Sequence, residues 1–306
     1  MRHARQVVLD EIGEKGQETI TNSHVLIVGL GALGSTVAEL LCRAGVARLT
    51  FCDYDIIQED NLQRQSLYTT ADIGRLKVEA AAAHVEAIDP SCTVSMITEP
   101  FSENVSLDSV NLIVDGTDSL HARLLVNDAA KKKNTPCVFG TAAGTRGFAF
   151  TGCWQCITLG KKATDSCDDG VIGSATHAIA SLQVAMAIRT LLDDPNKDLV
   201  ELDVWTGASR KITVPKNPAC KACAGSYEYL NAPFEVQFCE ATDRLQARPN
   251  KPKAIDLTTL ANVLEEFPTA RRVKVGKGTA LVHKHGTIEF ENVTKEEASA
   301  FVRSIK

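Results

Sequence analysis

The residues with the clearest chemical potential in this chain form a glycine-rich turn, the polar stretch after it, and two cysteine pairs. The turn, Gly29-Leu-Gly-Ala-Leu-Gly34, separates an apolar run from a helical one. Gly29 permits a tight turn, Gly31 lets a nucleotide approach the backbone, and Gly34 allows close helix packing. Asp53 ends the next apolar run, where a carboxylate can accept hydrogen bonds from ribose hydroxyls. This pattern predicts a nucleotide site, most commonly one for NAD.

The stretch after Asp53 favours ATP over NAD. A nicotinamide site needs mostly apolar surroundings, whereas attack of a carboxylate on an α-phosphate brings two anions together. Fixed cations such as Arg64 and Lys77 would stabilise the charge that grows on the phosphorus oxygens and on leaving pyrophosphate. Asn61 can hold ribose or phosphate oxygens without adding charge. Asp118, after a predicted strand, can ligate Mg²⁺, or it can simply cap the following helix.

At these positions the chain resembles the MoeB/ThiF family, relatives of the adenylation domains of ubiquitin-activating enzymes. The resemblance runs from about Arg5 to Cys223, and Asn-Leu-x-Arg-Gln is its most specific element. It implies that the chain uses ATP to adenylate the C-terminal glycine carboxylate of a ubiquitin-like or sulfur-carrier protein. The nucleotide-site positions that it implies are Arg5, Gly29, Gly31, Gly34, Asp53, Asp55, Asn61, Arg64, Gln65, Lys77 and Asp118.

The resemblance also implies individual roles. Asp53 would bind ribose, and Asn61, Arg64 and Lys77 would contact the triphosphate. Asp118 would hold Mg²⁺ or steer the attacking carboxylate. In this family an N-terminal arginine, here Arg5, reaches into the nucleotide site of a dimer partner, so a homodimer is expected. A downstream conjugating enzyme or a sulfur donor is a further candidate partner.

The cysteine pairs are spaced like metal-binding knuckles. Cys153-x-x-Cys156 and Cys220-x-x-Cys223 together offer four thiolates, enough for one tetrahedral structural Zn²⁺ that would staple the region between them. A redox role is the competing interpretation, but redox pairs occur singly at a helix start. The family resemblance includes the same zinc site.

Cys167 lies in a polar stretch before a long apolar one. The family places a cysteine here on a loop near the bound carrier tail, where some members form a thioester or an acyl disulfide. The flanking aspartates are expected to raise the thiol pKa and so to weaken the nucleophile. Some relatives need only adenylation, and the sequence leaves a covalent role for Cys167 open.

The elements that must position these groups alternate between strands and helices, which predicts a Rossmann-like, doubly wound and mostly parallel sheet. We expect an adenylation domain with the structural zinc site over residues 1–224. A long helix at 171–192 and a hairpin at 199–214 complete it. The expected strands are 24–29, 48–53, 93–97, 110–115 and 136–140, and the helices between them are 35–46, 76–88 and 120–132.

Residues 225–306 are expected to form a small C-terminal α/β domain. Leu257 to Phe267 carries apolar residues at helix spacing after Asp256, a plausible N-cap, which predicts a helix. Residues 247–253 are rich in proline and charge and predict a loop. Strands are expected at 272–275, 280–283 and 287–290, with a last helix from Lys295. The tail is too short for the sulfur-supplying rhodanese domain of some relatives.

Charge and the lengths of the apolar stretches argue against several classes of protein. The chain has 306 residues and a formal net charge of −5, which argues against nucleic acid as the main ligand. The N-terminus lacks the apolar core of a secretory signal, and no apolar stretch reaches the length of a membrane span, so we expect a cytoplasmic protein. The alternatives are activation of another carboxylate, such as one on a modified tRNA base, an NAD-dependent oxidoreductase, and a silent scaffold subunit.

Overall fold

The computed structural model describes residues 2–158, 170–195, 197–232, 236–240, 244–249 and 252–305. Cys167 therefore lies outside the described residues. The chain divides into two compact units, the first built from Met1–Ala163 and Gly170–Asn231, and the second chiefly from Ala232–Lys306. No helix in the described part of the chain is long and apolar enough to cross a membrane.

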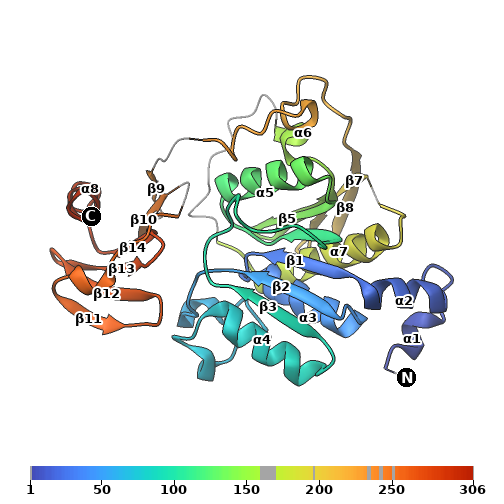
Figure 1. The fold of residues 1–306 in the computed structure, drawn as a ribbon, viewed down its shortest axis with the longest axis horizontal. Coiled ribbons are helices and arrows are strands. Elements are labelled where there is room, and N and C mark those ends of the chain that lie inside the picture. The colour runs from blue at the N-terminus through green and yellow to red at the C-terminus, as the bar shows by residue number, and fades with distance from the viewer. Residues whose placement is uncertain are drawn as a thin grey trace. The chain divides into compact units, whose positions relative to one another are not determined.

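An eight-stranded sheet forms the centre of the first unit, with the order β3-β2-β1-β4-β5-β6-β7-β8 (Figure 1). The first five strands run parallel, and β6 to β8 continue the sheet antiparallel. Successive strands are added in one direction from β1 to β3 and in the other direction from β4 onward, so the carboxyl ends of β1 and β4 flank the switch point where open sheets bind ligands. The strands are β1 (His24–Val28), β2 (Arg48–Cys52), β3 (Thr93–Ile97), β4 (Leu112–Asp115), β5 (Cys137–Ala143), β6 (Arg146–Thr151), β7 (Asp198–Asp203) and β8 (Ala208–Thr213).

Helices cover both faces of this sheet, as the alternating pattern predicts. Figure 1 shows α3 and α5 on opposite sides of β1, and α7 packs against α3, β5 and β6. The β1 residues Leu26 and Val28 share a core with Leu124 and Leu125 of α5. The Rossmann-like fold is thus confirmed. The helices are α1 (Ala4–Val7), α2 (Gly13–Asn22), α3 (Gly34–Ala44), α4 (Lys77–Ile88), α5 (Leu120–Lys133), α6 (Trp154–Thr158) and α7 (Gly173–Leu191).

The second unit contains a six-stranded antiparallel sheet in the order β11-β12-β13-β14-β10-β9 and the helix α8 (Lys295–Ser304). Thr294 and Glu297 form a capping box that starts α8 where the sequence predicts a helix. Phe290 and Phe301 pack edge to face between the sheet and this helix. The strands are β9 (Val236–Glu240), β10 (Arg244–Pro249), β11 (Val263–Glu266), β12 (Ala270–Val275), β13 (Gly278–His283) and β14 (Ile288–Glu291).

Two expectations for this unit are wrong. The predicted helix 257–267 is a short 3₁₀ turn, η4 (Leu257–Thr259), followed by β11. Asn262 between them has a φ of +58°, a left-handed conformation that an α-helix cannot contain. The predicted loop 247–253 includes the end of β10, because backbone pairing with β9 and β14 outweighs its proline and charge content.

Candidate nucleotide site and cysteine cluster

The glycine turn is built by two close backbone approaches. Gly29 has a φ of +82° and donates its amide to the Cys52 carbonyl at 2.9 Å. A Cβ at Gly34 would lie 1.8 Å from the Gly29 carbonyl oxygen, so only glycine fits there. No described side chain caps the start of α3, although the amides of Ser35 and Val37 already donate to the carbonyls of Gly31 and Leu33. The turn is open beside Gly31, where a Cβ would meet only the Gln65 side chain, at 3.9 Å, so a nucleotide can approach the backbone there.

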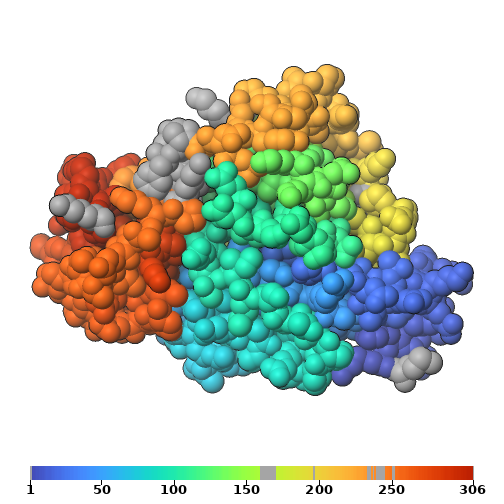
Figure 2. Space-filling model, in the orientation of Figure 1, coloured from blue at the N-terminus to red at the C-terminus, as the bar shows by residue number. Residues whose placement is uncertain are grey.

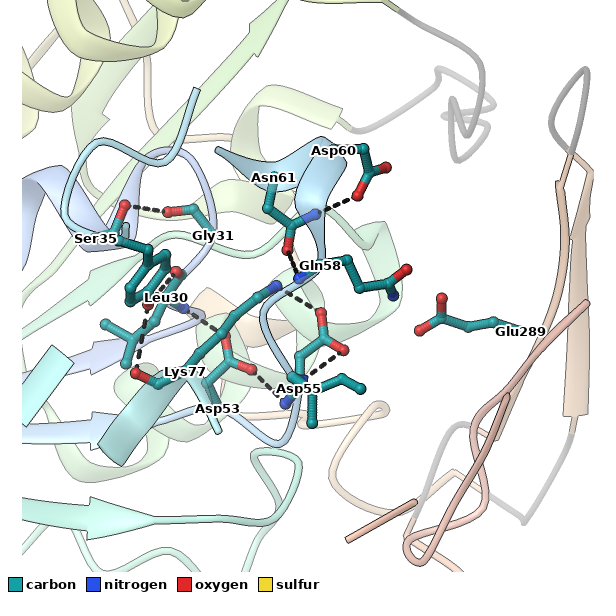
Figure 3. Close-up of polar contacts among 12 residues, drawn as sticks. Leu30, Gly31, Ser35, Asp53, Asp55, Gln58, Asp60, Asn61, Lys77 and Glu289 are labelled. Carbon is teal, nitrogen blue, oxygen red and sulfur yellow. Dashed lines mark hydrogen bonds and ion pairs between the residues drawn. The ribbon is translucent and has the colours of Figure 1, made fainter. Parts of the chain in front are cut away.

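Asp53 fixes the start of this turn. Its carboxylate accepts hydrogen bonds from the amides of Leu30, at 2.6 Å, and Asp55, at 2.8 Å (Figure 3). Asp53 is 8% exposed, and burial raises its pKa, against an opposing effect of Lys77. The residue expected to bind ribose thus lies at the mouth of the turn and also shapes it.

Lys77 opens α4 and turns its ammonium group toward these carboxylates. Nζ lies 2.5 Å from a carboxylate oxygen of Asp55, and the lysine side chain is 7% exposed (Figure 3). Burial would lower the pKa of Lys77, but Asp55 and Asp53 outweigh it and hold the pKa well above its usual value. The site therefore keeps one buried, permanently protonated ammonium beside the glycine turn.

The Asn-Leu-Gln-Arg-Gln run (residues 61–65) lies beside the glycine turn. Asn61 ends the 3₁₀ helix η1 (Glu59–Asn61), accepts a hydrogen bond from the Gln58 amide and donates one to Asp60. Arg64 is partly exposed, and its guanidinium donates to the Asp60 carbonyl at 3.0 Å. Gln65 is 3% exposed, and its Nε2 lies 3.9 Å from the position a Cβ would take at Gly31. Asn61 and Gln65 are thus buried, whereas Arg64 can still turn toward a ligand.

Tyr68 is a residue of the candidate site that sequence reasoning missed. Its hydroxyl donates to the Leu30 carbonyl at 2.9 Å, and so holds the glycine turn from within. The residue is 5% exposed, and burial raises the pKa of the phenol well above its usual value, so the hydroxyl stays a donor. No motif marks this residue, because the contact joins positions 38 residues apart.

Asp118 lies in the exposed part of the loop between β4 and α5. Its negative charge contributes to the raised pKa of Lys77, so the two groups act on the same region. Ser119, rather than Asp118, caps α5: its hydroxyl accepts from the Ala122 amide at 3.4 Å. The alternative in which Asp118 is the N-cap of this helix is therefore wrong.

Arg5 lies in α1 and is exposed. The neighbouring Gln6 donates to the carbonyl of Ala44, the last residue of α3, at 3.0 Å. The glycine turn is at the opposite end of α3, about 16 Å away for a helix of 11 residues. The structure therefore places Arg5 apart from the nucleotide-site residues of its own chain.

His177 of α7 contacts Ser66, the residue directly after the Asn-Leu-Gln-Arg-Gln run. Its Nδ1 lies 2.6 Å from the Gly173 carbonyl, and its Nε2 lies 2.7 Å from the hydroxyl of Ser66. Because a carbonyl oxygen only accepts, Nδ1 carries the proton and Nε2 accepts from Ser66. Sequence reasoning assigned His177 no role, since nothing in the sequence links it to a residue 111 positions earlier.

The four knuckle cysteines meet in one cluster. Their sulfur atoms all lie within 4.8 Å of one another, and the Cys153–Cys220 and Cys156–Cys223 distances are both 3.6 Å. Four thiolates around Zn²⁺ at 2.3 Å would be about 3.8 Å apart, so the cluster fits a tetrahedral ion. Burial raises the pKa of Cys153, and the neighbouring thiols add to the increase. Four further cysteines, Cys42, Cys52, Cys92 and Cys137, are buried outside this cluster.

Comparison with known proteins agrees with this geometry. The ThiF family model matches residues 3–222. The chain is 30% identical to the sulfur carrier protein ThiS adenylyltransferase of Bacillus subtilis, over 87% of this chain and 84% of that protein. It is also 30% identical to the molybdopterin-synthase adenylyltransferase of Salmonella typhimurium, over 73% of this chain and 96% of that one.

Longer relatives and solved structures extend this comparison. The adenylyltransferase and sulfurtransferase MOCS3 of Aedes aegypti is 31% identical, and the matched part spans 60% of its length. The crystal structure of MccB from E. coli with ATP has a TM-score of 0.63 at 20% identity, covering 73% of this chain and 75% of that one, which supports the shared fold. From the extent of these matches, this chain belongs to the ThiF family.

Proposed function

We propose that this protein uses ATP to adenylate the C-terminal glycine carboxylate of a ubiquitin-like or sulfur-carrier protein. The observation that carries the proposal is the buried Lys77 ammonium, held by Asp55 beside a glycine turn that Asp53 anchors. A hydride-transfer site has no use for this fixed cation. The relatives that match most of this chain are named adenylyltransferases of sulfur carriers or of molybdopterin synthase.

In the proposed reaction, a carrier carboxylate oxygen attacks the α-phosphorus of ATP. A bond forms between that oxygen and phosphorus, the bond from phosphorus to the bridging oxygen of the β-phosphate breaks, and pyrophosphate leaves. Lys77 and Arg64 supply positive charge where negative charge grows, so they stabilise the transition state more than the bound substrates. The nucleophile is already ionised, and the step needs no general base.

Two metal ions belong to the proposal. Asp118 would hold Mg²⁺ at the strand end, because magnesium is commonly bound through one carboxylate together with substrate phosphates. Cys153, Cys156, Cys220 and Cys223 would hold a Zn²⁺ with no open position, which makes it structural rather than catalytic.

The proposal includes a homodimer with two shared sites. Arg5 lies at the far end of α3 from the glycine turn of its own chain, so its guanidinium is better placed to serve a partner's nucleotide. Val8 and Leu9, directly after α1, are 73% and 49% exposed, an apolar surface that a partner would cover.

A covalent step at Cys167 would follow adenylation. The thiolate would attack the carbonyl carbon of the acyl-adenylate, forming a thioester and releasing AMP. Cys167→Ala should leave pyrophosphate exchange unchanged and remove any thioester that a reducing agent or hydroxylamine cleaves. If the thioester persists in Cys167→Ala, Cys167 is not the acceptor.

ATP–pyrophosphate exchange with Gly-Gly-ended carriers from the same genome tests the proposal. We expect exchange that requires one such carrier and disappears when its last glycine is removed. Arg64→Ala and Asp118→Ala should each abolish it, whereas Lys216→Ala, at an exposed lysine beyond β8, should not. Exchange driven only by small carboxylates or tRNA, a bound nicotinamide coenzyme, or exchange that survives Arg64→Ala would each contradict the proposal.

A further inference from the structure

Helix α5 connects the loop that carries Asp118 (residues 116–119, between β4 and α5) to the cysteine cluster. We call this loop the magnesium loop, after the proposed role of Asp118. The helix begins directly after Asp118 and Ser119, and three of its buried polar residues, Arg123, Asn127 and Asp128, contact either that loop or α6. Arg123 and Asn127 are four positions apart and so lie on one face of the helix. Figure 2 shows the green surface of α5 next to the orange surface of the residues after β8, which carry Cys220 and Cys223.

Arg123 fixes the backbone of this loop by hydrogen bonds. Its Nε donates to the Asp115 carboxylate at 2.7 Å, and one terminal nitrogen donates to the carbonyls of Thr117 and Gly140. Asp115 also accepts from the hydroxyl of Thr117 at 2.6 Å. The backbone that leads into Asp118 is thus fixed by one guanidinium, whose side chain is 8% exposed.

The same guanidinium also contacts the cysteine knuckle. Its central carbon lies 4.4 Å from the ring centre of Trp154, a cation–π contact in a buried setting. Trp154 follows Cys153 directly and opens α6, which also contains Cys156. One side chain therefore bridges the magnesium loop and the metal knuckle.

Asn127 and Asp128 hold the knuckle to α5 by further hydrogen bonds. Asn127 accepts from the Trp154 amide at 2.7 Å, and Asp128 accepts from Gln155 at 2.8 Å and from the Tyr229 amide at 2.9 Å. Gln155 in turn accepts from the Ala222 amide, between the second pair of cysteines. Both CxxC segments are thereby tied to the helix whose first turn follows Asp118.

We propose that Arg123 is a positioning residue for the Asp118 loop, and that metal binding by the four cysteines supports this loop through Trp154. A filled cysteine cluster fixes α6, the Trp154 ring fixes the Arg123 guanidinium, and Arg123 fixes Asp115 and Thr117. The inference rests on the proposed adenylation for the identity of the nucleotide. Because coupling between two binding sites is reciprocal, bound ATP must also tighten metal binding by the same factor.

The experiment measures this coupling in both directions on the full-length protein. Zinc affinity is measured at equilibrium by competition with a colorimetric chelator, with and without Mg-ATP, and ATP affinity is measured by calorimetry for zinc-loaded and zinc-depleted protein. We expect zinc depletion to weaken ATP binding by about five- to tenfold and ATP to tighten zinc binding by the same factor. Both effects should be lost in Arg123→Lys, which keeps the charge but not the fork that reaches Thr117 and Gly140.

Variants at Trp154 separate coupling from folding. Trp154→Phe retains a weaker cation–π contact, and Trp154→Leu removes it. Coupling should therefore be weaker in Trp154→Phe than in the wild type and weakest in Trp154→Leu, while the circular dichroism spectrum of both stays native. Trp205→Phe, at a tryptophan that is 76% exposed, serves as the matched control and also leaves Trp154 as the only tryptophan. The fluorescence of Trp154 in this variant should then change when Mg-ATP is added.

The outcomes distinguish this inference from the proposed function. ATP binding that is equal in zinc-loaded and zinc-depleted protein, or a zinc affinity that ATP leaves unchanged, overturns the coupling even if adenylation is confirmed. Coupling that is undiminished in Arg123→Lys and Trp154→Leu overturns the assigned route. If ATP binds and tightens zinc binding but no carrier supports exchange, the coupling stands and the proposed reaction fails.

Discussion

The ammonium group of Lys77 lies 2.5 Å from the carboxylate of Asp55, and together they link the first turn of α4 to the loop after β2. The lysine is nearly buried, whereas the carboxylate side chain is 26% exposed. Incoming phosphate oxygens can therefore compete with Asp55 for an ammonium that is already desolvated. The predictions below begin with this pair.

Lys77→Met should reduce ATP–pyrophosphate exchange by at least about 100-fold, because it removes a fixed charge from the transition state. It should also lower the free energy of unfolding by about 3 kcal/mol, since Asp53 and Asp55 lose their shared cation. Urea unfolding and exchange on the same samples give both values. Lys133→Met, at an exposed pair with Asp108, is the control and should change neither by much.

The double variant Lys77→Met/Asp55→Asn separates stability from chemistry. Removing the charge on Asp55 should restore most of the lost stability, but exchange should stay at the level of Lys77→Met. Recovery of exchange together with stability would show that Lys77 acts only in folding.

Arg5 should act on the partner's site. Arg5→Ala and Lys77→Met homodimers are each expected to be inactive in exchange. After the two are mixed and allowed to exchange subunits, about a quarter of wild-type activity should return. Half of the dimers would then be mixed, and each of these would have one intact site. No recovery, with subunit exchange verified by differently tagged chains, would place Arg5 outside the partner's site.

The cysteine cluster should hold one zinc ion per chain, measured by elemental analysis. Cys156→Ala should lose the metal and lower the melting temperature, because the thiolate cluster would lose a ligand. Cys92→Ala changes a buried thiol outside the cluster and should keep the zinc. Zinc retained in full by Cys156→Ala would mean that the four sulfurs do not form the site.

His177→Ala should raise the KM for ATP several-fold with little change in kcat. The imidazole holds Ser66, directly after Gln65, and its loss should loosen a segment that, in the proposed function, binds nucleotide before and during the reaction alike. Ser66→Ala should give a similar KM, because it removes the other half of the same hydrogen bond. Ser181→Ala, one turn further along α7, is the control. A fall in kcat alone would instead assign the imidazole a role in the transition state.

Asp72 should make stability depend on pH in the acid range. Burial would raise its pKa, but hydrogen bonds from His84 and Thr69 outweigh this and lower it to about 2. A carboxyl with a depressed pKa stabilises the fold fully above its unfolded pKa near 3.9, and this contribution is lost as pH falls toward 2. Asp72→Asn should remove about 2 kcal/mol at pH 6 and flatten the decline in stability between pH 4 and 2.

Urea unfolding at pH 6, 4 and 2.5 measures this difference. Glu103→Gln, at an exposed carboxyl, is the control and should follow the wild-type profile. A profile for Asp72→Asn that runs parallel to the wild type would show that another carboxyl carries the effect.

Local sequence alone determined most of the first unit. Alternating apolar runs and helical stretches fix a parallel sheet with helices on both faces, and Gly34 is dictated by a backbone contact within the same turn. The CxxC spacing likewise predicts two cysteine knuckles, because each pair lies within one short segment. These features follow from interactions between residues close in sequence, which pattern and residue type record.

Tertiary structure decided the contacts between distant positions. Cys153 and Cys220 meet across 67 residues, and Tyr68 reaches Leu30 across 38, pairings that only the packed sheet and helices bring together. In the second unit, the helical spacing from Leu257 to Phe267 yields to strand pairing with β12 once Asn262 takes a left-handed conformation. Apolar spacing along a chain records which residues are buried, but the partner that buries them is fixed only by the assembled fold.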